Sequence, residues 1–259
     1  MVKRIFIANH IIESFEQIGR MLLFIVEVSK EIFRRPIRTQ LIIQHLYFIG
    51  TQSTNIILLA GFFTGAVFGL QIGSIFELLK STPLIGGSTG IALTTELAPL
   101  LTGFLLAGRA GSAITAEIAT MKASEQIEAL EAMGINPINY LVVPRVIASL
   151  FIMSFLCGLF MFIGIVGCYV VGLYIYNVDE AMFFHQLKNL VTTDNIITGL
   201  RKMFVFSFII SIVACRTGLQ SSGGARGVGI ATTDSVVKSL VYILIMDFII
   251  SYFEVVWLK

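Results

Sequence analysis

Charged residues are scarce in this chain, and long stretches have none. Only 13% of the 259 residues are Asp, Glu, Lys or Arg, whereas an ordinary soluble domain has about 25%. Residues 39–76 and 146–178 contain no residue of these four types. Each stretch exceeds the roughly 20 apolar residues that carry a helix across a bilayer. The scarcity of charge excludes an ordinary soluble domain and indicates a membrane protein.

Other absences narrow the function. The chain has no G-x-x-x-x-G-K-[ST] loop, so we expect it not to bind ATP itself. The glycine-rich stretch SSGGARGVG at 221–229 follows no predicted strand, and we interpret it as a flexible cytoplasmic turn. The three cysteines and three histidines are too scattered for a metal site. A net charge of +2 gives no indication of a nucleic-acid partner, and no catalytic arrangement is recognisable.

The apolar stretches predict helices. They are continuous rather than alternating, which excludes a barrel, and helices and closed barrels are the structures that span a bilayer. We therefore predict an all-α membrane protein that forms a single domain over residues 1–259. Its transmembrane region covers 49–257 and has about five spans, at about 49–76, 91–115, 145–176, 196–216 and 236–257.

Residues 5–35 differ from the spans because charges surround an apolar stripe. This pattern favours an amphipathic helix lying in the membrane interface, and the alternative is a soluble helix packed on a partner. The residues that share the apolar face at helical spacing are Ile11, Phe15, Ile18, Leu22, Ile25 and Ile32.

The distribution of Lys and Arg predicts the orientation. With a cytoplasmic N-terminus, 13 of the 18 basic residues fall on cytoplasmic segments or their helix ends, and 5 fall on the opposite side. The positive-inside rule therefore places the N-terminus and residues 117–143 in the cytoplasm. Five spans then leave the C-terminus outside.

The first span contains Gly61, Gly65, Gly69 and Gly73 at four-residue spacing. Such a row lets another backbone approach closely. It indicates either packing within one subunit or a seam between two subunits of a dimer.

Residues 117–143 predict a short cytoplasmic helix over about 124–134. Ser124 is a candidate N-cap, Glu125 opens the first turn, and Gly134 suits a left-handed C-terminal position before Pro137. A helix this short is not stable alone, so it either docks on a partner or lies on the membrane surface. Its apolar edge comprises Ile127, Leu130 and Met133.

Four charges interrupt or border the apolar spans: Glu96, Arg201, Lys202 and Asp247. A charge at membrane depth costs roughly 2.5–3.5 kcal/mol, which makes each a functional candidate. Pro99 weakens the helix beside Glu96 because it lacks an N–H. The alternatives are a structural ion pair for Glu96 and Asp247 and an outward-reaching side chain for Lys202. We expect Lys202 to interact with Asp247.

The most distinctive segment is ELAPLLTGFLLAGRAGSAITAEIATMKASEQIEALEAMGINPINYLVVPR at 96–145. With GAVFGLQ at 65–71, GIATTDSVV at 229–237 and the region of Asp247, it resembles the MlaE/YrbE-type permeases of ABC lipid transporters. Two positions depart from the family pattern. Ala98 replaces a glycine, and Thr95 replaces an arginine of the better-known member.

The resemblance implies an assembly. Two permease copies form a homodimer, two separate ATPase subunits bind ATP and Mg beneath it, and an MCE-domain protein sits on the outer face. The 124–134 helix resembles the coupling helix that enters the ATPases, which implicates Glu125, Ile127, Leu130, Met133 and Gly134. Family positions for charges in the lipid cavity fall on Glu96, Lys202 and Asp247.

We therefore interpret the chain as the permease subunit of an ABC transporter for phospholipids or related lipids in a bacterial inner membrane. It is not itself an enzyme, and Glu96 is expected near the lipid path. One alternative is an ABC permease for another hydrophobic substrate, such as a sterol or an organic solvent. Another is a secondary transporter that uses Glu96 and Asp247 as proton carriers.

Overall fold

The computed structural model describes residue 16 and residues 19–32 and 38–257. Within these ranges the chain is helical and contains no strand, as predicted. Five helical stretches among the described residues are long and apolar enough to cross a membrane. They are Thr39–Leu78, Thr82–Ala123, Ile138–Tyr174, Thr193–Leu219 and Gly224–Val256.

Three of these spans are single long α-helices, and two contain other helical turns. The single helices are α2 (Thr39–Leu78), α9 (Thr193–Leu219) and α10 (Gly224–Trp257). The second span begins with the 3₁₀ turn η1 (Thr82–Leu84), and the third combines the π-helical turn η4 (Ile138–Val142) with α7 (Val143–Tyr174). The second span continues through α3 (Ile85–Ala92), η2 (Leu93–Leu97), α4 (Ala98–Leu106), η3 (Ala107–Gly111) and α5 (Ser112–Ala123), where η2 and η3 are π-helical.

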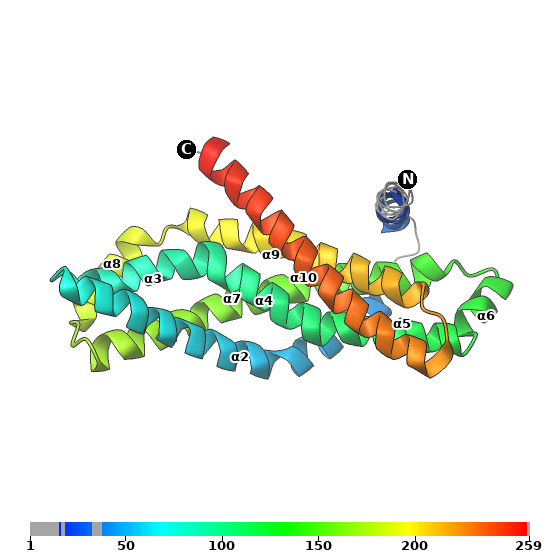
Figure 1. The fold of residues 1–259 in the computed structure, drawn as a ribbon, viewed down its shortest axis with the longest axis horizontal. Helices are drawn as coiled ribbons and strands as arrows, with labels where there is room; N and C mark the ends of the chain where they lie inside the picture. Colours follow the sequence, from blue (N-terminus) through cyan, green and yellow to red (C-terminus); the bar gives the residue numbers. More distant parts are fainter. Residues whose placement is uncertain (1–15, 17–18, 33–37, 258–259) are drawn as a thin grey trace, which may run out of the picture.

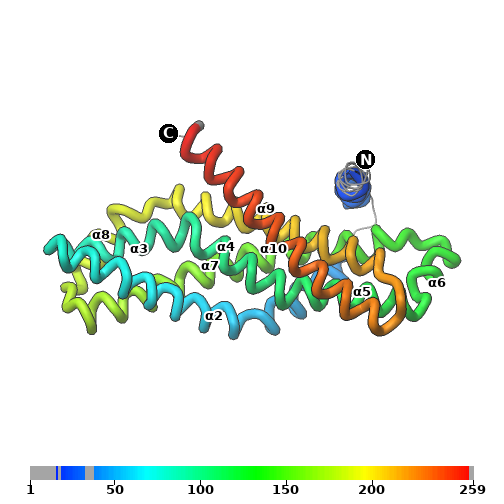
Figure 2. Tube along the Cα trace, viewed as in Figure 1, coloured from blue at the N-terminus to red at the C-terminus, as the bar shows by residue number. Residues whose placement is uncertain are grey.

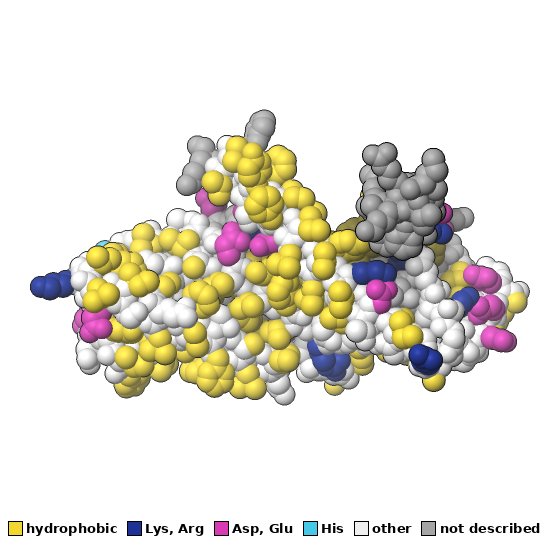
Figure 3. Space-filling model, in the orientation of Figure 1, with side chains coloured by type: hydrophobic (Ala, Val, Ile, Leu, Met, Phe, Trp, Pro, Cys, Tyr) yellow, Lys and Arg dark blue, Asp and Glu magenta, His cyan; other side chains and the backbone are white. Residues whose placement is uncertain are grey.

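The spans form an elongated bundle (Figure 1). The tube in Figure 2 shows α2, α7 and the second span running along the long axis, while the C-terminal part of α10 diverges from the bundle. The short helices α8 (Glu180–Leu190) and α6 (Gln126–Ala132) lie at opposite ends. Figure 3 shows apolar side chains covering the middle of this face and most charges at the ends, the distribution expected of a bilayer-spanning bundle.

The glycine row of α2 packs against α7 of the same chain. A Cβ on Gly65 would lie 1.8 Å from the carbonyl oxygen of Gly164, and one on Gly167 would lie 2.1 Å from that of Phe62. The two backbones are therefore in direct contact, which only glycine permits at these positions. Because α7 covers the buried face of the row, this face is not available as a seam with a second copy.

Two connecting segments are shorter than the sequence predicts. Residues 77–90 and 217–235 were expected between spans, but helix α3 begins at Ile85 and α10 begins at Gly224. The glycines of α3 lie against α8, with a Cβ on Gly86 falling 2.7 Å from the ring of Phe183. Close packing thus outweighs the low helix propensity of glycine. The interpretation of 221–229 as a flexible turn was wrong from residue 224 onward.

The spans also begin earlier than predicted. Helix α2 starts at Thr39 rather than about residue 49, since the polar residues of 39–49 continue the helix instead of ending it. Of the predicted amphipathic helix over 5–35, residues 19–32 are helical and Val28 packs in the main apolar core. The remainder of that prediction, apart from Glu16, lies outside the described residues.

The close contact between α2 and α7 predicts that a single added methyl group at this contact destabilises the fold. We expect Gly65→Ala to lower the free energy of unfolding by about 1–3 kcal/mol, because the added Cβ overlaps the α7 backbone. Gly158→Ala is the matched control, since a Cβ at that position of α7 meets nothing within 4 Å. Thermal unfolding of the purified chain in detergent measures both, and equal stability of the two variants would contradict the packing argument.

Candidate functional site

A buried lysine lies among three carboxylates inside the bundle. The side chain of Lys202, on α9, is 0% exposed, and its Nζ lies 2.7 Å from Oε2 of Glu96. It also donates a hydrogen bond of 2.8 Å to the hydroxyl of Ser251. Two further carboxylates of α10 lie 3.7 Å from Nζ, those of Asp247 and Glu254. We call Glu96, Lys202, Asp247, Ser251 and Glu254 the charge cluster.

The backbone around Glu96 is irregular, and this positions its side chain. Glu96 lies in the π-helical turn η2, and Pro99 follows near the start of α4, as the weakened helix beside the acid predicted. The hydroxyl of Thr95 donates to the carbonyl oxygen of Ile91 and occupies one backbone acceptor of this turn. Gly199 lets α9 approach closely, since a Cβ there would lie 2.0 Å from the carbonyl oxygen of Thr94. Lys202, three residues later on α9, therefore reaches Glu96.

The structure brings together the three membrane-depth charges that the sequence singled out, but the closest partners differ. Lys202 contacts Asp247 as expected, yet Glu96 is nearer by 1.0 Å, the difference between 3.7 and 2.7 Å. Sequence reasoning missed Ser251 and Glu254. Both follow Asp247 at helical spacings of four and seven residues, which would have placed them on one face of α10. Arg201 is exposed and points to Thr198 instead.

The charge cluster carries more negative than positive groups. Three carboxylates surround one ammonium, and Oδ1 of Asp247 is buried with no hydrogen-bond partner among the described residues. The Glu96 side chain is 46% exposed, whereas Lys202 is enclosed. The cluster therefore presents carboxylate oxygens outward and can accept a cationic or hydrogen-bond-donating group. Figure 3 shows acidic side chains near the diverging part of α10, in an otherwise apolar region.

The predicted cytoplasmic helix is present as α6, with a different N-terminus. The hydroxyl of Ser124 donates to the carbonyl oxygen of Thr120, so Ser124 ends α5 and does not cap α6. Glu125 takes its place with a left-handed φ of 59°. The predicted left-handed Gly134 is confirmed, with a φ of 75°. The N–H of Ile135 donates to the carbonyl oxygen of Leu130, closing a Schellman-type end.

The apolar edge of α6 is divided between the protein core and the surface. Ile127 is buried in the main apolar core, Leu130 is half-buried, and Met133 is 66% exposed. The expected docking edge is therefore wrong for Ile127, because this side chain already anchors α6 to its own chain. Lys122 of α5 forms an ion pair with Glu128, and its hydrogen bond lowers the pKa of the Glu128 carboxyl below the ordinary value.

A second ion pair joins the helices on either side of α6. Nη2 of Arg145, near the start of α7, lies 2.7 Å from Oε1 of Glu117 on α5. Nη1 of the same guanidinium donates to the carbonyl oxygen of Leu141 in η4. Arg145 is buried while Glu117 is about half exposed. The pair fixes the two ends of the loop that carries α6 to each other.

Metal ligation has no candidate residues in the part of the chain that the structure describes. No group of three or more His, Cys, Asp or Glu side chains there could hold a metal ion. Cys157, Cys168 and Cys215 are buried singly. The charge cluster groups the buried Lys202 with three partly exposed carboxylates.

Comparison with known proteins shows similarity to one family of membrane permeases. Residues 42–253 match a family described as Permease MlaE. A probable ABC transporter permease protein of Rickettsia typhi is 39% identical over 245 residues, 95% of this chain and 95% of that protein. Similar proteins with the same description occur in a Synechocystis species, at 38% identity over 87% of this chain and 86% of that protein, and in Pyropia yezoensis, at 38% over 84% and 82%.

The charge cluster predicts non-additive stability losses. Lys202→Met leaves three carboxylates without a counter-charge, and we expect it to cost about 3–5 kcal/mol of unfolding free energy. Adding Asp247→Asn to this variant should recover part of the loss, because one of the repelling groups is removed. Lys188→Met removes an exposed lysine of α8 and should change stability by less than about 0.5 kcal/mol. Strictly additive losses in thermal unfolding would show that the groups do not interact.

Proposed function

Because this chain belongs to the MlaE permease family and is an ABC transporter permease subunit, we propose that it moves phospholipids or related lipids. A permease of this kind is a multi-pass membrane subunit rather than an enzyme, and it works with separate ATPase subunits. We place ATP and Mg in those ATPases. The lipid passes from or to an MCE-domain protein on the opposite side of a bacterial inner membrane.

The charge cluster is the observation that supports a lipid with a polar headgroup. A sterol or an organic solvent would need only an apolar cavity, whereas this site maintains three carboxylates at membrane depth despite their desolvation cost. The half-exposed carboxylate of Glu96 is suited to the ammonium of a zwitterionic headgroup. Lys202 is enclosed, so its role is to offset the carboxylates rather than to bind a phosphate.

An ion-coupled transporter is the rival that uses the same residues. Its proton carriers would be Glu96 and Asp247, which both lie beside Lys202 in the charge cluster. The relatives are named ABC transporter permeases, which supports ATP as the energy source. We therefore assign the cluster to lipid contact.

A homodimer completes the proposed assembly. Of the five candidate spans, α10 has the smallest buried share, 11%, so most of this apolar helix is left for a second copy or for lipid. The excess of Lys and Arg at the α6 end supports a cytoplasmic N-terminus and a periplasmic C-terminus. In this orientation Met133 and the exposed carboxylates of α6 face the ATPases.

Transport should depend on the carboxylate of Glu96. We expect Glu96→Gln to slow lipid transfer by about 10-fold or more, since a charged hydrogen bond contributes about 1.5–3 kcal/mol. Glu180→Gln on α8 is the control, because this carboxylate is exposed and remote from the charge cluster. The measurement is ATP-driven lipid transfer by the complex reconstituted in liposomes, with lipidomics of the purified complex. Unchanged transfer would remove Glu96 from the lipid path, and absence of bound phospholipid would reject the substrate class.

Two substitutions, one in α6 and one at its C-cap, should affect different properties. Met133→Asp should weaken ATPase binding by about 1–2 kcal/mol without destabilising the permease, since its side chain is exposed. Ile127→Asp should instead cost about 3 kcal/mol or more of permease stability, because it buries a charge in the core. Glu131→Gln provides an exposed control on the same helix. Co-purification of the ATPase and thermal unfolding distinguish the effects, and full ATPase retention by Met133→Asp would reject α6 as the coupling element.

A further inference from the structure

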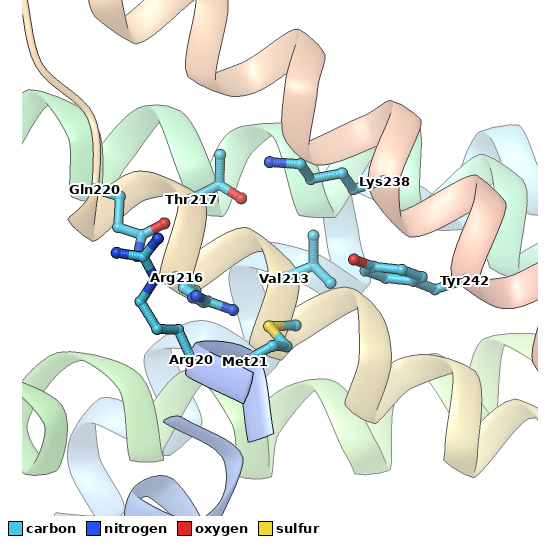
Figure 4. Close-up of a pocket in the computed structure, with 8 residues that line it drawn as sticks. All are labelled: Arg20, Met21, Val213, Arg216, Thr217, Gln220, Lys238 and Tyr242. Atoms are coloured by element: carbon cyan, nitrogen blue, oxygen red, sulfur yellow. The ribbon is translucent and has the colours of Figure 1, made fainter. Parts of the chain in front are cut away.

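A basic pocket lies where residues 19–32 meet α9 and α10, remote from the charge cluster (Figure 4). Its volume is about 300 Å³. Arg216 lines it from α9, and Lys202 is 14 residues earlier on the same helix, about 21 Å along the axis at 1.5 Å per residue. The lining residues are Arg20, Met21, Val213, Arg216, Thr217, Gln220, Lys238 and Tyr242.

The polar lining suits a phosphate. Arg20 extends toward Gln220 in Figure 4, and the Lys238 side chain extends toward Thr217. Guanidinium and ammonium groups together with hydroxyl and amide donors are the groups that bind phosphate oxygens. These side chains come from three separate helical segments, so a bound phosphate would connect them.

Two carboxylates moderate the positive charge of the pocket. Glu16 lies 3.4 Å from Arg20, and both side chains are more than half exposed. Asp234 lies 2.6 Å from Lys238, one turn away on α10. Ion pairs this accessible to solvent are weak, so a phosphate can replace either carboxylate as the partner.

An apolar pocket adjoins the basic one and shares Met21 and Tyr242 with it. Its volume is about 460 Å³, and apolar side chains of residues 19–32, α9 and α10 line it. The other residues that line it are Leu22, Ile25, Val205, Phe208, Ile209, Ile212, Ile245 and Met246.

The basic pocket lies at the end of the apolar spans, and the apolar pocket lies alongside their uncharged parts. Residues 203–215 of α9 carry no charge, and Arg216 follows them directly. Residues 239–246 of α10 likewise carry no charge, and Lys238 precedes them. The basic pocket therefore lies at the polar boundary of the bundle, and the apolar pocket extends from it toward membrane depth.

We propose that the adjoining pockets form a binding site for one anionic membrane phospholipid. Its phosphate lies between Arg20, Arg216 and Lys238, and an acyl chain lies along Phe208 and Ile212. A free phosphate would not occupy the apolar pocket, and a purely apolar ligand would not contact the polar lining of the basic pocket. The site does not depend on the proposed function, because a lipid held here need not be transported. Its occupant links residues 19–32 to α9 and α10.

The test counts phosphatidylglycerol bound to the full chain. The chain in detergent micelles is titrated with phosphatidylglycerol or phosphatidylcholine, and native mass spectrometry counts the retained lipid. We expect the double variant Arg20→Gln/Lys238→Gln to weaken phosphatidylglycerol binding about 25-fold, at about fivefold per basic residue. Lys30→Gln/Arg226→Gln is the matched control, because it removes the same charges from the same two helical segments at exposed positions outside the pocket. Its affinity should change less than twofold.

Further variants separate the possible occupants. Arg20→Lys/Lys238→Arg should retain binding, which shows that the loss follows charge rather than misfolding. Ile245→Trp fills the apolar pocket and should weaken phosphatidylglycerol and phosphatidylcholine alike. Inorganic phosphate at the lipid's concentration should displace nothing.

Four results would overturn the proposal. The first is undiminished phosphatidylglycerol binding by the glutamine double variant, and the second is an equal loss of binding in its control. The third is displacement of the lipid by inorganic phosphate. The fourth is a change of oligomeric state in Ile245→Trp without any change in retained lipid. The last result would identify a second copy of the chain as the occupant. None of these measurements bears on transport, so the proposed function is tested separately.

Discussion

Direct contact between helix backbones is the constraint on which the rest of this structure depends. Lipid offers no hydrophobic drive for helices to associate, so a membrane bundle relies on shape, and glycine permits the closest approach. Gly65 and Gly167 bring α2 and α7 together, and α7 also packs against α4 and α9. Gly199 repeats the device where α9 meets η2. The position of Lys202 beside Glu96 is thus a consequence of backbone packing and not only of electrostatic attraction.

The charge cluster links the least buried span to the rest of the bundle. Two of its three carboxylates, Asp247 and Glu254, belong to α10, and their common partner belongs to α9. Helix α10 diverges beyond the bundle toward its C-terminus, so few apolar contacts hold that part in place. A buried ion pair is costly to form but strongly directional. The residues that we propose contact lipid therefore also join α10 to α9.

The distribution of charge along the sequence was sufficient to predict the number of spans and three members of the charge cluster, Glu96, Lys202 and Asp247, because charge is expensive at membrane depth. It was not sufficient for features that depend on neighbours. Ser124 ends one helix rather than starting the next, since its hydroxyl donates to the carbonyl oxygen of Thr120 and Glu125 occupies the N-cap of α6. Ile127 is covered by its own chain, which a local helical pattern does not reveal. Glu254 was overlooked because it lies near the end of a span, where charges ordinarily reach solvent.

The π-helical turns η2 and η3 interrupt the second span, whereas α2, the first span, is one continuous α-helix. Each π-helical turn accommodates one extra residue and displaces the helix face that follows it by about 100°. Helix α4 is consequently a nine-residue segment between two joints, with Glu96 in one and Arg109 in the other. The path along the second span from α6 to Glu96 therefore crosses the irregular turn η3, and η2 itself holds Glu96, whereas α2 runs for 40 residues without a break.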